Sequence, residues 1–404
     1  MKKVLVMWPP QLMFYGSVFR HFTFVGETID YICKNVDAEV EYIDCGIEMY
    51  SLKVIQNHFK NNQYLVIYGE TYTIESCRKM AKLAKQVNPQ IKIIGFGRAF
   101  CYMPQYFLNN NFDAVVVNGF WEKSIVDFIN ENTADDCGEI LTLEGRKGKP
   151  YQLQPDEWGV PRLDKIPYEK YFEITQKKQL EICVNKGCPY NCSFCSEKFV
   201  YGRKEGRRSP NNLIKFIESS HHLCDTYFFD ATTFTFDKQW VKEVCEKIKA
   251  LPYKIKWCTT TRLDELSEDL IKMMSEAGCF RLSVGVETLN KDIQKNVHKE
   301  INYNNMIDLF NLLKKYNIKP RALLICGLPG QTKEELLHTY QKVKEMDLDF
   351  RFKEYAPYNE ILKDGVSRQV IDRFDRTEYM SDDIDVKDLS SEQYMELLFA
   401  DTGR

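Results

Sequence analysis

The sequence lacks long hydrophobic runs, a charge excess and internal repeats. No stretch of about 18 apolar residues occurs, so no transmembrane helix is expected. The 55 basic and 58 acidic residues leave a net charge of -3, which argues against a dedicated nucleic-acid binder. The apolar run at residues 4–8 is too short for a signal peptide and predicts a strand. With 404 residues, 44% of them hydrophobic, the chain suits two or three globular domains.

Cysteine, in contrast, is abundant, with 14 residues. Most cysteines are single and scattered, and several fall in apolar runs, where a free thiol behaves as a small hydrophobe. Together with the size of the chain and the lack of a signal, this pattern predicts a reducing compartment and a cytoplasmic protein. One group stands apart, because Cys188, Cys192 and Cys195 lie within eight residues of one another.

The N-terminal part predicts an α/β domain over residues 1–135. Helical patterns separate five apolar, β-branched runs, which implies a parallel sheet covered on both faces in a doubly wound, flavodoxin-like (Rossmann-like) arrangement. The ligand-binding edge of such a sheet lies at the carboxyl ends of its strands. The expected strands are Val4–Trp8, Val40–Ile43, Tyr64–Tyr68, Ile91–Ile94 and Ala114–Val117.

Residues 136–177 have no sustained period and predict a linker, with room for a short hairpin. Alternation resumes over 178–356, where six β/α units in series predict a partial (β/α)6 TIM barrel with its chemistry at the carboxyl ends of the strands. Residues 357–404 are polar and acidic and predict a short C-terminal extension with one helix.

The segment CVNKGCPYNCSFCSEK follows the first barrel strand and carries the three clustered cysteines. Three thiolates on one Gly/Pro/Asn-rich loop can surround a metal centre. A structural zinc site is the alternative, but it needs four ligands, and the next Cys or His is the distant His221. Three cysteines can instead hold a [4Fe–4S] cluster with one iron left open.

The CxxxCxxC spacing, with Phe194 before the third cysteine, resembles that of the radical S-adenosylmethionine (SAM) enzymes. The order of the two domains resembles the class that carries an N-terminal cobalamin-binding domain, the class B methylase-like enzymes. Further segments occur in the family's order: VPRLDKIPYEKYF before the motif, GRRSP at 206–210, FFDATTFTFD at 228–237, RLSVGVETLN at 281–290 and LLICGLPGQT at 323–332.

The resemblance implies that the three cysteines ligate the cluster and that its open iron binds the amino and carboxylate groups of SAM. An electron from the cluster then cleaves SAM to a 5′-deoxyadenosyl radical, which removes a hydrogen atom from the substrate. The implied SAM contacts are Phe194 and the pair Ile325 and Gly327 for adenine, Asp230 with Thr232 for the amino group, Arg262 for the carboxylate and Glu287 for the ribose.

Each of these positions has a plainer interpretation. Asp230 could cap a turn, Arg262 and Glu287 could form an ion pair at the barrel rim, and Ile325 and Gly327 could serve packing and a turn.

The resemblance also implies cobalamin at the strand ends of the first domain. The sequence has no Asp-x-His-x-x-Gly run, the usual source of a lower axial histidine. The alternative is that the first domain is only a scaffold. The residues expected at the cobalamin edge are Pro9, Pro10, Thr71, Tyr72, Gly95, Gly97, Arg98 and Gly119.

The leading interpretation is a cobalamin-dependent C-methyltransferase that acts on a peptide or natural-product substrate and receives electrons from a flavodoxin or ferredoxin. The second is a non-methylating radical SAM enzyme that rearranges, cyclises, epimerises or dehydrogenates its substrate. The third, from another class, is a non-enzymatic zinc or nucleotide-binding module. We expect neither membrane binding nor dedicated nucleic-acid binding.

Overall fold

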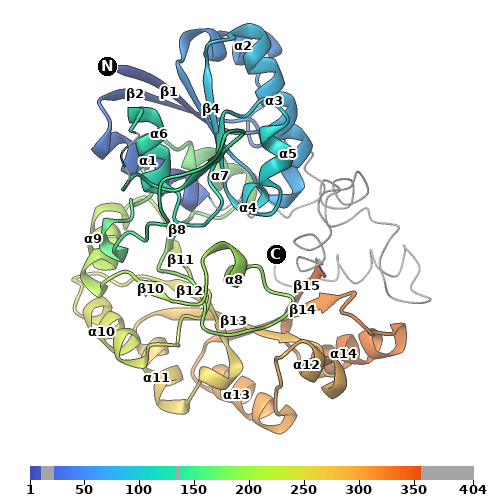
Figure 1. The fold of residues 1–404 in the computed structure, drawn as a ribbon. Helices are drawn as coiled ribbons and strands as arrows, with labels where there is room; N and C mark the ends of the chain where they lie inside the picture. Colours follow the sequence, from blue (N-terminus) through green and yellow to red (C-terminus); the bar gives the residue numbers. More distant parts are fainter. Residues whose placement is uncertain (11–21, 133, 135, 356–404) are drawn as a thin grey trace. The chain divides into compact units, whose positions relative to one another are not determined.

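Alternating strands and helices form two units in the computed structural model (Figure 1), which describes residues 1–10, 22–132, 134 and 136–355. The first unit comprises Met1–Lys177 and Phe199–Gly202, and the second comprises Lys178–Lys198 and the described residues from Arg203 onward. The C-terminal extension predicted at 357–404 lies outside the described residues. None of the described helices is long and apolar enough to span a bilayer.

The first unit is built on a seven-stranded sheet with the strand order β2-β1-β3-β4-β5-β6-β7. The strands are β1 (Lys2–Trp8), β2 (Ala38–Asp44), β3 (Tyr64–Tyr68), β4 (Lys92–Phe96), β5 (Ala114–Val115), β6 (Ile140–Thr142) and β7 (Gly145–Lys147). Strands β1–β5 are parallel, so the expected doubly wound sheet is confirmed. Two antiparallel strands, β6 and β7, extend it as a hairpin.

Helices cover both faces of this sheet (Figure 1). They are α1 (Phe22–Asn35), α2 (Leu52–Asn61), α3 (Ile74–Val87), α4 (Arg98–Tyr102), α5 (Pro104–Leu108), α6 (Glu122–Asn130) and α7 (Tyr168–Thr175). Helices α1 and α6 pack together on one face, and α2 packs with α3 on the other. Residues of β1 from Val4 to Met7 are fully buried, because a central parallel strand meets helices on both sides.

Residues 136–177, expected as a linker, group with the first unit. They supply the β6–β7 hairpin and α7. Tyr171 of α7 is 3% exposed and donates its hydroxyl to the buried Asp44 at the end of β2. This stretch is therefore packed structure, although its sequence has no periodicity that would predict the packing.

The second unit contains a six-stranded sheet in which every strand pairs in parallel with its neighbour, in the order β15-β14-β13-β12-β11-β8. The strands are β8 (Gln179–Cys183), β11 (Thr226–Asp230), β12 (Trp257–Arg262), β13 (Cys279–Glu287), β14 (Lys319–Cys326) and β15 (Asp349–Glu354). Among the described residues, β8 and β15 are the edges of this sequentially ordered sheet, which makes it an open partial barrel. The six predicted β/α units are confirmed.

The outer side of this barrel carries helices (Figure 1): α9 (Pro210–Ser220), α10 (Lys238–Lys249), α11 (Glu268–Glu276), α12 (Lys291–Asn296), α13 (Tyr303–Lys315) and α14 (Lys333–Glu345). Each begins after a side chain that accepts a hydrogen bond from the first turn, which satisfies amides that the helix leaves free. These N-cap residues are Ser209, Asp237, Ser267, Asn290, Asn302 and Thr332.

The packing of the first unit's sheet can be tested at Gly95 in β4. A Cβ at this position would lie 2.0 Å from the Phe100 ring, so Gly95→Ala should lower the free energy of unfolding by roughly 1–3 kcal/mol through overpacking. Urea unfolding of the cofactor-free protein measures the change, with Lys92→Ala at an exposed position of the same strand as control. Equal stability of Gly95→Ala and wild type would contradict this packing.

Candidate active site

The three clustered cysteines lie on the loop that follows β8. The chain passes through the short strand β9 (Asn185–Lys186), the cysteine loop and helix α8 (Glu197–Val200), and returns as β10 (Gly206–Arg207), which pairs antiparallel with β9. Gly187 adopts φ +85°, and a Cβ there would lie 2.3 Å from the carbonyl oxygen of Lys204. The two ends of the loop therefore meet closely at a position that only glycine fits.

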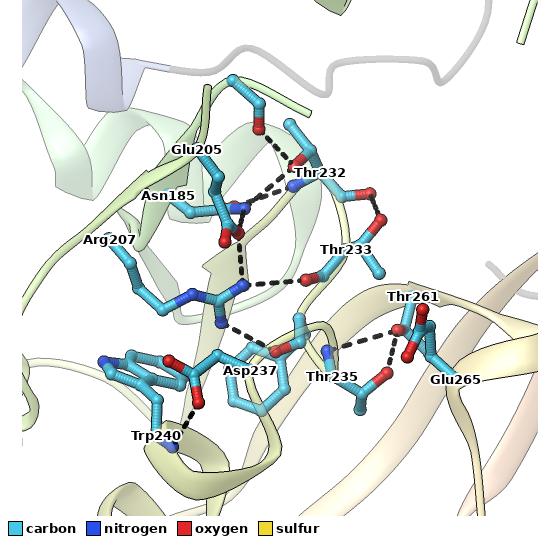
Figure 2. Close-up of polar contacts among 12 residues, drawn as sticks. Asn185, Glu205, Arg207, Thr232, Thr233, Thr235, Asp237, Trp240, Thr261 and Glu265 are labelled. Atoms are coloured by element: carbon cyan, nitrogen blue, oxygen red, sulfur yellow. Dashed lines mark hydrogen bonds and ion pairs between the residues drawn. The ribbon is translucent and has the colours of Figure 1, made fainter. Parts of the chain in front are cut away.

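A polar network fixes the base of this loop against the end of β11 (Figure 2). Asn185 accepts from the amide of Thr232 at 2.9 Å and donates its Nδ2 to the Thr232 hydroxyl, also at 2.9 Å. The Thr232 hydroxyl donates to the carbonyl of Gly187 at 3.0 Å. Thr232, predicted to help bind the SAM amino group, is thus engaged in holding the start of the loop.

Glu205 and Arg207 complete the network from the other end of the loop. Glu205 accepts from Asn185 and from Arg207. Arg207 also donates to the carbonyls of Phe234 at 2.8 Å and Thr233 at 3.0 Å. The sequence analysis singled out the GRRSP segment but not this role of Arg207, nor Asn185 and Glu205. Apart from the Glu205–Arg207 pair, their partners lie 20 or more residues away in the chain.

Burial raises the pKa of the Cys188 thiol to about 11 and that of Cys195 to about 12, and the charges of Glu197 and of the neighbouring cysteines add to both shifts. Both thiols are therefore neutral near pH 7 when no metal is bound, and binding a metal would displace their protons. Cys192 is 7% exposed and accepts from Nη1 of Arg262 at 3.3 Å.

Arg262 ends β12, and its guanidinium is held on three sides. It forms two hydrogen bonds with Asp264, of 2.9 and 2.7 Å, and its Cζ lies 3.9 Å from the centre of the Tyr190 ring. Tyr190, within the cysteine loop, donates its hydroxyl to Glu265. Arg262, predicted to bind the SAM carboxylate, thus contacts Cys192 directly. The alternative ion pair between Arg262 and Glu287 is not formed, because Arg262 pairs with Asp264 and Glu287 with Lys299.

Phe194, in the cysteine loop, packs with Ile325, and Lys299 connects it to Glu287. Phe194 packs against the buried cluster of Ile293, Val297, Ile325 and Leu328. Glu287 ends β13 and pairs with Lys299, with 2.6 Å between Nζ and Oε1. Gly327, at φ +85°, donates its amide to Gln331 at 2.8 Å and makes the turn after β14. Asp230 ends β11, and its carbonyl accepts from the amide of Val184.

These residues fit a [4Fe–4S] cluster with SAM. Soft thiolates are the ligands that iron–sulfur clusters prefer, and all three come from one loop fixed at its base. Among the described residues, no group of three His, Cys, Asp or Glu side chains is placed so that it could hold a single metal ion. Phe194 and Ile325 offer an apolar surface to a purine, and Glu287 offers a carboxylate to hydroxyl groups.

The predicted cobalamin residues lie at the carboxyl edge of the first unit's sheet. Pro9 and Pro10 follow β1, and the rest of that loop, 11–21, lies outside the described residues. Thr71 and Tyr72 form a short 3-10 turn after β3. Arg98 follows β4, and its Nη1 lies 3.6 Å from Glu70. The side chains of Thr71, Tyr72 and Arg98 are half-buried at this edge and could contact the polar groups of cobalamin.

The glycines at this edge have explanations within the chain. Gly95 makes room for Phe100. Gly97, at φ +106°, would place a Cβ 2.6 Å from the carbonyl of Gly69, and Gly119 would place one 2.1 Å from the Tyr201 ring. Each glycine is thus required by close packing of the protein itself, so the edge fits cobalamin through its polar side chains rather than through an open glycine cradle.

The fold and the cysteine motif are similar to those of known proteins. The radical SAM superfamily model matches residues 182–343. An uncharacterised methyltransferase from Pyrococcus horikoshii is 25% identical over 72% of this chain and 66% of its own length. The anaerobic magnesium-protoporphyrin IX monomethyl ester cyclase of Rubrivivax gelatinosus is 26% identical over 71% of this chain and 55% of its own length. The chain thus spans about half to two thirds of the length of these relatives.

The solved structure of the radical SAM methyltransferase TsrM from Kitasatospora setae, with cobalamin and a [4Fe–4S] cluster bound, superposes with a TM-score of 0.71 at 17% identity. The match covers 89% of this chain and 77% of that one. Residues 182–343 thus match the radical SAM superfamily of enzymes. Over most of its length, the chain shares the fold of this solved structure.

Cys192→Ala tests the cluster assignment. The anaerobically reconstituted wild type should hold about four irons per chain, and the variant should lose them, because two thiolates cannot retain the cluster. Iron and sulfide analysis measures the loss. Cys224→Ala, at another half-buried cysteine of the same unit, should keep its iron. Retention of iron by Cys192→Ala would show that the cluster assignment is wrong.

Arg207→Met tests the base of the loop. It removes the buried positive charge that pairs with Glu205 and leaves two backbone carbonyls without their donor. We therefore expect the free energy of unfolding to fall by roughly 3 kcal/mol or more and iron to be lost faster to a chelator. Lys204→Met, an exposed position three residues earlier, is the control. Wild-type stability and iron retention in Arg207→Met would exclude a role for the network.

Proposed function

We propose that the protein is a cobalamin-dependent radical SAM methyltransferase acting at a carbon atom. The observation that carries this proposal is the cysteine loop at the mouth of a partial barrel. Its Phe194 packs with Ile325 and is connected to Glu287 through Lys299. The methyltransferases among the relatives and the TsrM fold support the methylating chemistry.

In this proposal Cys188, Cys192 and Cys195 hold the cluster, and Arg262 orients Cys192 through its 3.3 Å contact. Phe194 and Ile325 pack against the adenine of SAM and exclude water from that side, while Gly327 shapes the turn beneath it. Asp230 and the backbone around Thr232 would hold the methionine amino group. Glu287 accepts hydrogen bonds from the ribose.

When bound, the cluster supplies an electron for SAM cleavage and cobalamin carries the methyl group. One SAM gives up its methyl group and leaves as S-adenosylhomocysteine. A second SAM leaves as methionine and 5′-deoxyadenosine, which carries the hydrogen taken from the substrate carbon. Two electrons from a one-electron donor protein of the flavodoxin or ferredoxin class balance the reaction. The Pro10, Thr71, Tyr72 and Arg98 side chains are the groups that would contact cobalamin.

The substrate class that we propose is a peptide or a natural product, methylated in the cytoplasm. A second function, a radical SAM reaction without methyl transfer, is favoured by one observation. A relative that matches a similar share of the chain is named as a cyclase rather than a methyltransferase.

Cofactor content and SAM products separate the two functions. Wild type reconstituted anaerobically with iron, sulfide and hydroxocobalamin, then desalted, should hold about four irons and one cobalt per chain. With reductant it should convert SAM to both 5′-deoxyadenosine and S-adenosylhomocysteine. Metal analysis and chromatography of the products measure these quantities.

Cys192→Ala is the matched control, because it should keep cobalt while it loses iron and the formation of 5′-deoxyadenosine. Iron and 5′-deoxyadenosine without cobalt or S-adenosylhomocysteine would favour the non-methylating function. Wild type that forms no 5′-deoxyadenosine would contradict both functions.

A further inference from the structure

We propose that Lys299 is a positioning residue that holds the Glu287 carboxylate ready for the ribose of SAM. This inference rests on the proposed use of SAM and adds a residue to the site. Lys299 lies beyond α12, twelve residues after Glu287, and its Nζ lies 2.6 Å from Oε1 of that carboxylate. The two side chains are only 8% and 10% exposed.

Three features of the chain serve this ion pair. Glu287 adopts φ +62°, a conformation that costs a non-glycine residue free energy. The register of β13 against β14 shifts between Gly285 and Glu287. A Cβ on Gly285 would lie 2.2 Å from Nζ of Lys299 and 2.4 Å from Oε1 of Glu287. The strand end is thus irregular at the place where it presents this carboxylate.

The carboxylate keeps capacity for a ligand. Lys299 is its one hydrogen-bond partner among the described residues, and it uses Oε1. Oε2 is left to accept hydrogen bonds from vicinal hydroxyl groups. Because burying two charges costs several kcal/mol in desolvation, a pair of this kind contributes little net stability and is better explained by a need for a fixed charge.

Lys299 also faces the cysteine loop. Its Nζ lies 5.8 Å from the centre of the Phe194 ring. The amide of Ser193 donates to the carbonyl of Val297 at 3.1 Å, and Phe194 packs on Ile293 and Val297. The segment from α12 to Lys299 therefore links the loop that would carry the cluster to the carboxylate that would bind the ribose.

Lys299→Met and Lys299→Arg test the inference in the reconstituted full-length protein. Removing the ammonium group frees the carboxylate to turn away, so Lys299→Met should weaken SAM binding about 10- to 100-fold at unchanged iron content. Lys299→Arg, which keeps the charge, should bind SAM within a few-fold of wild type. Anaerobic equilibrium dialysis with SAM gives the dissociation constants.

Arg321→Met is the matched control for a purely structural ion pair. Arg321 and Asp349 are 8% and 9% exposed and form a buried ion pair. Arg321 lies near the start of β14, whereas Gly327 follows the end of that strand. This variant should lower the thermal midpoint as Lys299→Met does, but leave the affinity of the folded protein for SAM unchanged. SAM affinity at the wild-type level in Lys299→Met would overturn the inference.

The double variant Glu287→Gln/Lys299→Met removes both charges and guards against failure to fold. It should recover stability relative to Lys299→Met but still bind SAM weakly, and tight binding would overturn the inference. Wild type that neither binds nor cleaves SAM would instead reject the proposed function. The two failures are therefore distinguishable.

Discussion

The constraint on which the site depends is that one loop without regular structure must bring three thiols to a single centre. Ordering a Gly/Pro/Asn-rich loop costs conformational entropy, and the cost is smaller when the ends of the loop are held. Here the ends are held twice, by the β9–β10 pairing and by the network of Asn185, Glu205 and Arg207 on the end of β11. Ser193 adds a third attachment, to Val297.

These attachments give the two halves of the site a common frame. The base of the loop is tied to β11, Arg262 at the end of β12 touches Cys192, and Lys299 connects Phe194 with Glu287 at the end of β13. Successive strands of the barrel thus each contribute one anchor. A displacement of one of these strand ends would therefore be transmitted to the cysteine loop.

The fold could be predicted from the sequence because its strands and helices each leave a local hydrophobic pattern. Buried parallel strands appear as apolar runs and surface helices as amphipathic periods, so β3 begins and ends where it was expected. The cysteine loop was found by its spacing alone. A short hairpin was expected within 136–177, but α7 was not predicted, because its packing depends on a distant partner, Asp44.

The contacts of the site itself could not be derived from sequence. Lys299 has no local signal, and its importance appears only when the irregular end of β13 turns Glu287 toward it. Gly95, Gly97 and Gly119 were assigned to a cofactor, whereas the structure supplies neighbours in the chain that already require glycine. Close approach of backbone explains a glycine equally well whether the neighbour is a ligand or a side chain.

The central claim is that the cysteine loop holds a cluster whose open iron meets SAM. The most direct measurement is the electron paramagnetic resonance spectrum of the reduced, reconstituted protein before and after addition of SAM. The account predicts a [4Fe–4S] signal whose g values change when SAM is added, because SAM binds at the iron. A cluster signal that is the same with and without saturating SAM, or no cluster signal at all, would contradict it.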